Sequence, residues 1–507
     1  MKKEAIESTL WKNATKLRGS VEWGEYKHII LSLLFLKFTN DNFIKHREIL
    51  IKDNKEKYLD NIDFYTKDNI VYLPESARWN YLIENASTAD ISQKIDNALA
   101  SIEKNNPTLS GALPSDNFVR LQIPQSKVKQ LLDSINNIDD DFEDFDIIGL
   151  VYEYFLSKFS EAEGKEGQYF TPKHTIKLMN ELLKPDKGIV YDPCCGTGGM
   201  FVQTYEYLKE NEINTKDISF YGQESVLTNY KLARMNLSIR GINNDLGNTS
   251  ADTFFKDQHK DLKTDYIFAN PPFNQSGWRS ENELIDDIRW KGYKPPLPGN
   301  ANYGWILHMI HKMKNQSEAA FLLANGALED DDSLEIRKQI INNDIVEAII
   351  TLPRNMFYST DASVTLWILN KDKKGKTVTK NNEIYKYKNR VNEILFLDLR
   401  KAGKKIGKKI VMTDIDIQNA VTTFYDWRIG NFKAKEEYSK NTSLSEIKEN
   451  NYSLVPSRYI DFIDKDLDVD FDSEIKKLQK SFAIDIEIQE NAISDIKKTM
   501  KDLGYEI

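Results

Sequence analysis

Apolar residues near the start of the chain recur at helical spacing. Between Tyr26 and Phe38 they stand three and four residues apart, and residues 128–135 repeat this spacing. Such a recurrence places apolar side chains on one face of a helix, and no strand-like alternation of apolar and polar residues competes with it. We therefore predict an all-helical N-terminal domain over residues 1–160.

Residues 168–399 follow a different pattern, in which short apolar runs alternate with helical segments. This alternation is typical of a parallel sheet whose strands are joined by crossover helices. The predicted fold class is therefore α/β, with a doubly wound, Rossmann-like sheet. The expected strands are residues 189–192, 218–223, 265–269, 319–323, 346–351, 364–369 and 394–397.

The chain beyond Pro456 is strongly charged, and its apolar residues follow three- and four-residue steps. That spacing favours a coiled-coil-like helix that pairs with a helix of another subunit. A polar hinge with two glycines, residues 161–167, marks the other boundary. The predicted domains are thus 1–160, an α/β domain over 161–460, and a C-terminal helical tail over 461–507. The apolar positions of the tail are Ile475, Leu478, Phe482, Ile486, Ile493, Ile496, Met500 and Leu503.

The composition fits a globular protein of two or three domains, since 40% of the 507 residues are hydrophobic and 29% are charged. The most apolar stretch, residues 29–38, contains Ser32 and Lys37 and is shorter than the roughly 20 residues that a membrane span requires. Glu4 and Glu7 argue against a secretory signal. We expect a cytoplasmic protein that has no membrane association.

The net charge of −9 would argue against a nucleic-acid partner, but the charge is unevenly distributed. Residues 371–410 contain 14 Lys and Arg residues against 4 Asp and Glu residues. Residues 371–390 of this basic segment lie between the last two expected strands, so we predict an exposed hairpin or loop there. A stretch of this kind suits a solvated surface about as well as it suits DNA phosphates.

A glycine-rich segment, Asp192-Pro-Cys-Cys-Gly-Thr-Gly-Gly199, follows the first expected strand and precedes a helix. Its glycines allow the backbone to turn tightly and to approach a ligand closely. Position 201 is Phe, so the third glycine of a dinucleotide fingerprint is missing, and Gly375-Lys376-Thr377 lacks the leading glycine of a Walker loop. The segment therefore predicts a nucleotide-like cofactor without phosphate cradling.

Acidic residues follow the next two segments of the expected sheet. Glu224 closes the second strand, where a carboxylate can bind ribose hydroxyls. Asp252 ends the following segment and could accept a hydrogen bond from an adenine amino group. The adjacent Cys194 and Cys195 lack the spaced companions of a zinc site, so we expect small packing residues and no metal.

The segment Asn270-Pro-Pro-Phe273 stands at the end of a buried strand. Two prolines prevent a regular helix, so the Asn270 amide and the Pro271 carbonyl point out of the sheet. An exocyclic amine is a poor nucleophile, and acceptors for both of its hydrogens favour a pyramidal, more nucleophilic nitrogen. Phe273 offers a face on which an extracted base can stack. The following residues, 275–302, are a candidate lid.

The glycine segment and Asn270-Pro-Pro-Phe273 together resemble the amino-methyltransferases that act on DNA. Three further segments resemble the modification subunit of type I restriction-modification systems, so that the resemblance spans nearly the whole chain. They are Gly167-Gln-Tyr-Phe-Thr-Pro-Lys-His174, Leu10-Trp-Lys-Asn-Ala-Thr-Lys-Leu-Arg-Gly19 and Ser453-Leu-Val-Pro-Ser-Arg-Tyr-Ile460.

The resemblance implies a methyltransferase sheet and the transfer of a methyl group from S-adenosylmethionine to the N6 of an adenine rotated out of DNA. Asn rather than Ser at position 270 favours adenine over cytosine, and Lys173 stands where Arg is common in the family. The expected catalytic residues are Asn270, Pro271, Pro272 and Phe273. The expected cofactor contacts are Gln168, Tyr169, Phe170, Thr171, Pro172, Lys173, Asp192, Gly196, Thr197, Gly198, Gly199, Glu224 and Asp252.

The resemblance also implies partners. No target-recognition domain is visible after Leu399, so the choice of DNA sequence is expected to belong to a separate specificity subunit. No helicase-type phosphate loop occurs, so the restriction subunit is expected to be another chain. The predicted assembly joins two modification subunits to one specificity subunit on double-stranded DNA.

Two other functions remain open at this point. The same Asn-Pro-Pro-aromatic loop can serve methyl transfer to RNA or to protein glutamine, although such enzymes lack a long helical N-terminal domain. The chain could also be a noncatalytic scaffold, against which the intact Asn270, Glu224 and glycine segment argue.

Overall fold

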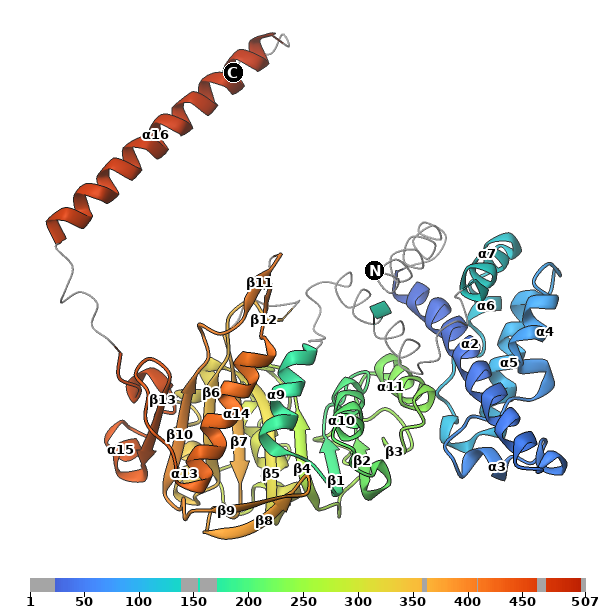
Figure 1. Cartoon of the computed structure of the whole chain (residues 1–507), viewed down its shortest axis with the longest axis horizontal. Helices are drawn as coiled ribbons and strands as arrows, with labels where there is room; N and C mark the ends of the chain where they lie inside the picture. Colours follow the sequence, from blue (N-terminus) through green and yellow to red (C-terminus); the bar gives the residue numbers. More distant parts are fainter. Residues whose placement is uncertain are drawn as a thin grey trace. The chain divides into compact units, whose positions relative to one another are not determined.

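The computed structural model describes residues 23–137, 154–155, 171–357, 363–407, 409–462 and 471–502 (Figure 1). The chain divides into one compact unit, Met1–Ile460, and a second unit, Asp461–Ile507. The predicted hinge at 161–167 and the expected cofactor residues Gln168, Tyr169 and Phe170 lie outside the described residues.

The N-terminal region is helical, as predicted. Its central helix α2 buries apolar residues on more than one side, including Ile30, Leu31, Leu34 and Phe35, and a helix that is apolar all round must be covered by others. The covering helices α5 and α7 each present one apolar face. The helices of this region are α2 (Trp23–Lys52), α3 (Asp63–Thr66), α4 (Trp79–Glu84), α5 (Ile91–Asn105), α6 (Asn117–Arg120) and α7 (Gln125–Asn136).

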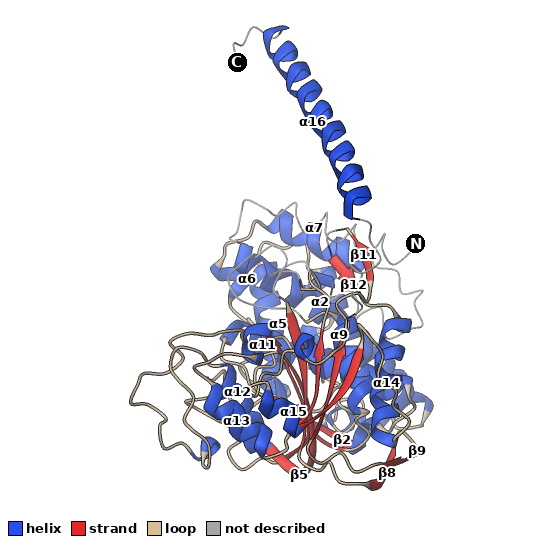
Figure 2. Ribbon diagram, turned by 90° about the vertical axis from the view of Figure 1, so that its left-hand side faces the viewer, coloured by secondary structure: helices blue, strands red, loops and turns tan. Residues whose placement is uncertain are grey.

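A nine-stranded sheet forms the centre of the second region, with strand order β13-β10-β6-β7-β5-β4-β1-β2-β3 (Figure 2). All seven expected strands are present. The two strands that the sequence did not indicate are both weak signals, because β3 has only two residues and β13 reads Ser-Lys-Asn-Thr-Ser. The strands are β1 (Gly188–Asp192), β2 (Ile218–Gly222), β3 (Asn244–Asp245), β4 (Thr264–Ala269), β5 (Met313–Ala324), β6 (Val346–Thr351), β7 (Val364–Asn370), β10 (Glu393–Asp398) and β13 (Ser439–Ser443).

The sheet is mixed, so the expectation of a wholly parallel sheet is wrong at two strands. Strand β7 runs antiparallel to both β5 and β6, and β13 runs antiparallel to β10. An antiparallel neighbour needs no crossover helix. Residues 352–363 therefore suffice to bring the chain back from β6 into β7, and apolar runs alone do not reveal the direction of a strand.

Helices cover both faces of the sheet, which makes the fold doubly wound as predicted. Successive residues of β1 point to opposite faces, so that Val190 joins one core and Tyr191 the other. Helices α9, α10, α11 and α14 pack on the Val190 side, and α12 and α13 pack on the Tyr191 side. These helices are α9 (Lys173–Leu183), α10 (Gly199–Glu210), α11 (Leu227–Ile239), α12 (Asn302–Lys312), α13 (Leu334–Asn342), α14 (Asp414–Ile429) and the short α15 (Leu444–Glu449).

The basic segment forms two hairpins, β8–β9 (Lys376–Lys380 and Glu383–Tyr387) and β11–β12 (Lys404–Ile406 and Lys409–Val411). The prediction of a hairpin between β7 and β10 is therefore confirmed. Its full exposure is wrong, because Lys373, Lys380 and Arg390 are buried. These three side chains form ion pairs with Asp344, Glu318 and Glu347.

A buried ionic network ties β5, β6, β7, α14 and this hairpin together. Arg428, at the end of α14, donates to Glu318 and to Glu347, the latter at 2.6 Å, and Arg390 Nε donates to Glu347 at 3.1 Å. Asn370 Nδ2 adds a hydrogen bond of 2.9 Å to Glu347. Burial acts most strongly and would raise the pKa of Glu347, but Arg428 and Arg390 outweigh it and lower this pKa to about 2.

Among the described residues of the second unit is the helix α16 (Phe471–Asp502), of 32 residues, and none of the side chains of this helix is buried. The described part of the predicted apolar stripe, from Ile475 to Met500, is exposed to solvent. Among the helices of the described residues, none combines the length and the apolar character that a membrane crossing needs.

Replacing Arg428 tests the network. We expect Arg428→Ala to lower the free energy of unfolding by about 3–5 kcal/mol, because it leaves two carboxylates buried beside a reduced positive charge. We also expect the free energy of unfolding of the wild type to fall as the pH drops from 4.5 towards 2. The lowered pKa of Glu347 means that its ionised form stabilises the folded protein, and this stabilisation is complete above pH 4.5 and is lost as Glu347 is protonated.

Urea unfolding at several pH values measures both effects. The control is Lys401→Ala, which removes a surface ion pair to Glu437 whose lysine is 71% exposed and should change stability by roughly 0–1 kcal/mol. A loss below 1 kcal/mol in Arg428→Ala would contradict the importance of the network.

Candidate cofactor and catalytic site

The expected site residues meet at the carboxyl edge of the sheet. Strand β1 pairs in parallel with β2 on one side and β4 on the other, so the chain leaves all three strands at the same edge. Asp192 ends β1, Glu224 follows β2 and Asn270 follows β4. Ligands of open α/β sheets bind at such an edge.

A pocket lies there. It brings together six of the predicted residues: Thr171, Asp192, Gly196, Thr197, Gly199 and Asn270. Its other walls are Ile176, Cys194, Cys195 and Met200. The sequence did not single out Ile176 and Met200, because an apolar residue inside a helix gives the same signal whether it faces a core or a ligand.

The backbone of the glycine segment explains why glycines stand there. Gly196 and Gly198 have φ values of +56° and +81°, in the left-handed region that side chains with a Cβ avoid. A Cβ at Gly196 or Gly199 would meet nothing within 4 Å. The loop thus presents an open surface towards the pocket, as a loop that receives a cofactor should.

Three backbone N–H groups of the loop are held by residues at the ends of β1 and β2. Cys194 N donates to Asp192 Oδ1 at 3.0 Å, Cys195 N donates to the Gln223 carbonyl at 3.0 Å, and Gly196 N donates to Glu224 Oε2 at 2.9 Å. The other oxygen of Glu224 accepts from Val226 N at 2.7 Å. A carboxylate has about four acceptor positions, so Glu224 can shape the loop and still accept from a ribose hydroxyl.

The two carboxyl groups of the site are buried, and this burial governs their charge. Burial raises the pKa of Asp192 to about 7, against a smaller lowering by the Cys194 N–H, and it also raises the pKa of Glu224. Burial likewise raises the pKa of Cys194 and of Cys195, so both thiols stay neutral. This environment suits the predicted packing role of the cysteines.

Asn270 is held by the segment that precedes β1. Its Nδ2 donates to Thr171 Oγ1 at 2.9 Å, which fixes the orientation of the amide. Pro271 is buried, Pro272 is exposed, and Phe273 is half-buried. The Phe273 ring lies edge-on to Phe357, with ring centres 6.2 Å apart. The Asn-Pro-Pro-Phe loop is therefore anchored at both of its ends.

Among the other expected residues, Pro172, Lys173 and Asp252 are not part of the pocket lining. Pro172 is buried before α9, and Lys173 is exposed on its first turn. Asp252 is exposed, and its Oδ1 accepts from Phe254 N at 2.7 Å and closes a turn. The hydrogen bond from Ala251 N to the Glu224 carbonyl, 2.8 Å long, keeps that turn beside the ends of the strands.

The candidate lid, residues 275–302, is closed at its base. Gly277 N donates to the Pro298 carbonyl at 3.0 Å, and Ala301 N donates to the Gln275 carbonyl at 2.9 Å. Trp278 and Trp290 are buried in the core on the Tyr191 side. Any movement of this segment is consequently confined to its outer part.

Comparison with known proteins gives the family. The N-6 DNA methylase family matches residues 143–467, and the HsdM N-terminal domain matches residues 6–138. The chain belongs to the N-6 DNA methylases of type I restriction-modification systems. The type I restriction enzyme HindI methylase subunit of Haemophilus influenzae is 37% identical to this methylase over 86% of the chain and 100% of the relative. The type I restriction enzyme MjaIX methylase subunit of Methanocaldococcus jannaschii is 33% identical over 99% of the chain and 92% of the relative.

Solved structures agree on the fold. The type I methyltransferase subunit from Streptococcus thermophilus superposes with a TM-score of 0.74 at 22% identity, covering 90% of this methylase and 100% of that chain. The methylase is thus an S-adenosylmethionine-dependent, adenine-specific DNA methyltransferase subunit of the type I class. The alternatives of an RNA or glutamine methyltransferase and of a noncatalytic scaffold find no support.

Asp192→Asn tests the charge state inside the site. The raised pKa of Asp192 means that its protonated form stabilises the folded protein. This contribution to the free energy of unfolding is complete below pH 3.8 and is lost as the pH rises to about 7. Asn keeps the acceptor for Cys194 N and does not ionise. Between pH 4 and 7 the wild type should therefore lose about 1.4 kcal/mol per pH unit relative to the variant.

Urea unfolding at pH 5 and pH 7.5 measures this difference. The matched control is Asp245→Asn, because Asp245 accepts from the N–H two residues later in the same way but is exposed. Parallel pH profiles of the wild type and Asp192→Asn would show that the Asp192 carboxyl is ionised throughout.

Proposed function

We propose that the pocket at the ends of β1 and β4 binds S-adenosylmethionine and that Asn270 presents the N6 of adenine to it. The observation that carries this proposal is that Asn270 and the glycine segment line the same pocket. The glycine segment, which we assign to the cofactor, and Asn270, which we assign to the target amine, can therefore contact ligands in the same pocket.

The described residues fit the parts of this cofactor. Glu224 accepts from the ribose hydroxyls, Asp252 accepts from the adenine amino group of the cofactor, and the open loop at Gly196 and Gly199 lies beneath the methionine portion. Of the segment 168–173, which we assign to the methionine end, the described residues are Thr171, Pro172 and Lys173, and Thr171 lines the pocket. When bound, S-adenosylmethionine supplies an electrophilic methyl group on a positively charged sulfur. The buried carboxyl of Asp192 lines the same pocket, and its negative form favours that charge.

The catalytic loop acts on the target base by orientation. Thr171 Oγ1 accepts from the Asn270 amide nitrogen, which fixes the plane of the amide and with it the direction of its oxygen. This oxygen and the Pro271 carbonyl accept the two N6 hydrogens, which leaves the N6 lone pair aimed at the methyl carbon. One of the two N6 protons would leave to solvent as N6 takes up the methyl group that bound S-adenosylmethionine would supply. Phe273 stacks on the rotated base.

The three parts of the chain divide the remaining tasks. We assign DNA and specificity-subunit contacts to the helical N-terminal domain, residues 1–160, catalysis to residues 161–460, and subunit docking to residues 461–507. An exposed 32-residue helix with an apolar stripe supports the last assignment, since such a stripe favours pairing with another helix. A specificity subunit joins two methylase subunits and selects the sequence, and the restriction subunit is a further chain.

Asn270→Ala separates catalysis from cofactor binding. We expect the single-turnover rate of methyl transfer to fall at least about 100-fold, because one of the two acceptors that orient N6 is lost, while the Kd for S-adenosylmethionine changes less than about 3-fold. Rapid-quench assays and calorimetry give the two values. Asn343→Ala, which removes an exposed amide that donates to Tyr293, serves as the control. Equal losses of rate and affinity would refute the assigned role.

Dependence on a specificity subunit is tested by transfer of radiolabelled methyl to unmethylated DNA, with the products digested to nucleosides. We expect N6-methyladenine when the neighbouring specificity subunit is added and little or none with this chain alone. A chain truncated after residue 470 should bind S-adenosylmethionine normally and lose the stimulation. Robust site-specific methylation by the chain alone would refute the division of labour.

A further inference from the structure

Helix α11 has no single outer face, because two apolar stripes run along it. Tyr230, Ala233 and Leu237 pack in the core of the sheet domain. Leu232, Met235 and Ile239 pack in the core of the N-terminal helices. Each stripe follows three- and four-residue steps, and the two stripes lie on opposite sides of the helix. The last two turns of α11 are therefore part of both cores.

The side of α11 that faces the sheet domain also holds the cofactor loop. Asn236 is 1% exposed, and its Nδ2 donates to the Thr197 carbonyl at 2.9 Å. The N–H of the same peptide, on Gly198, donates to the Cys195 carbonyl at 2.9 Å. A Cβ at Gly198 would lie 3.4 Å from Leu237. The Thr197–Gly198 peptide is thus fixed at both of its polar ends, and one of the two partners comes from α11.

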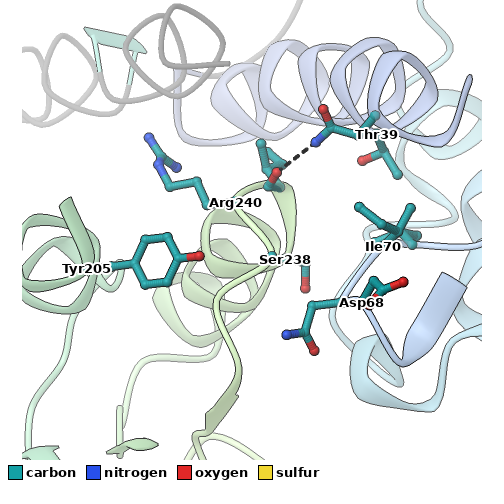
Figure 3. A pocket seen from close by; sticks show the side chains of 11 residues that line it. Thr39, Asp68, Ile70, Tyr205, Ser238 and Arg240 are labelled. Atoms are coloured by element: carbon teal, nitrogen blue, oxygen red, sulfur yellow. Dashed lines mark hydrogen bonds between the residues drawn. The ribbon is translucent and has the colours of Figure 1, made fainter. Parts of the chain in front are cut away.

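The other side of α11 is bound to α2 of the N-terminal domain. Asn42 Nδ2 donates to the Ile239 carbonyl at 3.0 Å, the contact drawn as a dashed line in Figure 3. Figure 3 also shows Ser238 and Arg240 opposite Thr39 of α2 and the loop at Asp68 and Ile70, around a small pocket. Arg240 then donates back to the carbonyl of Asn236, at 3.1 Å, and to its side-chain oxygen.

These contacts form one continuous path. We propose that Asn236 is a positioning residue for the cofactor loop, and that the hydrogen bonds Asn42–Ile239, Arg240–Asn236 and Asn236–Thr197 couple the N-terminal helical domain to the binding of S-adenosylmethionine. This inference rests on the proposed function of the pocket and adds a means of regulating it. Because coupling is reciprocal, a ligand of the N-terminal domain that changes cofactor affinity has its own affinity changed by the cofactor by the same factor.

The nature of the two side chains supports the path. The amide of Asn236 can donate to Thr197 through its nitrogen and accept from Arg240 through its oxygen at the same time. Arg240 follows the residue whose carbonyl Asn42 holds, so a shift of α2 moves the guanidinium and with it the amide. An aliphatic residue at position 236 would leave the Thr197 carbonyl without this donor.

Calorimetric titration of the full-length chain with S-adenosylmethionine is the test. We expect Asn236→Ala to raise the Kd about 3- to 10-fold, the effect of one lost hydrogen bond, and Asn42→Ala to raise it about 2- to 5-fold. Asn236→Asp should weaken binding as Asn236→Ala does, because a carboxylate cannot donate to Thr197, although it still accepts from Arg240. At saturating cofactor, in complex with the specificity subunit, the single-turnover rate of each variant should change less than about 2-fold.

A double-mutant cycle decides whether the residues act through one path. In the double variant Asn42→Ala/Asn236→Ala, the Kd should rise by less than the product of the two single effects, whereas independent sites would give that product. The matched control is Arg234→Ala. Arg234 also lies on α11 and joins it to the N-terminal domain through the Thr108 and Ser110 carbonyls, but it makes no contact with Asn236 or Thr197 in any hydrogen bond of the structure.

Each outcome has a distinct meaning. An unchanged Kd for S-adenosylmethionine in Asn236→Ala, accompanied only by a lower thermal unfolding midpoint, would overturn the positioning role. An equal loss of affinity in Arg234→Ala would replace the path with a general loosening of the interface. Absence of cofactor binding by the unmodified chain would overturn the proposed function itself, and the inference with it.

Discussion

The parallel pairing of β1 with both β2 and β4 is the constraint on which the site depends. It brings Asp192, Glu224 and Asn270 to one edge of the sheet although they are far apart in the chain. Once they are together, Glu224 can hold Gly196 N, and Thr171 can hold the Asn270 amide. The meeting of these three side chains at one edge is therefore a consequence of strand order.

A site of this kind costs stability, which the rest of the domain must supply. Asp192 is buried, and its pKa near 7 means that its ionised form is disfavoured in the folded protein. The ionic network of Glu318, Glu347 and Arg428 lies elsewhere in the domain and has the opposite character, because burial of each charge is matched by partners in direct contact. The sheet thus combines a region in which buried charges of opposite sign are paired with a pocket in which burial disfavours the ionised form of a carboxyl group.

Much of this arrangement could be predicted from the sequence. Local signals were sufficient for the seven strands, for the glycine segment and for Asn270-Pro-Pro-Phe273, because each depends on the residues within one short window. Long-range pairing was not accessible in the same way. The burial of Lys380 and Arg390 depends on acidic partners in β5 and β6, and the antiparallel direction of β7 depends on how the chain returns. The number of basic residues in a segment does not show whether they are buried, and a run of apolar residues does not show the direction of a strand.

The role of α11 shows the same limit and also a signal that could have revealed it. Tyr230, Ala233 and Leu237 form one stripe, and Leu232, Met235 and Ile239 form another, so the helix has no polar face of ordinary width. Such a helix must be covered on two sides. One stripe of α11 packs in the core of the sheet domain. The other stripe is covered by the N-terminal helices, which come earlier in the chain. A helix shared by two cores cannot shift against one without disturbing the other, and the cofactor loop is attached to it through Asn236. Under the proposed function, the binding of a partner by the N-terminal domain and the binding of the cofactor are linked through the packing of a single helix.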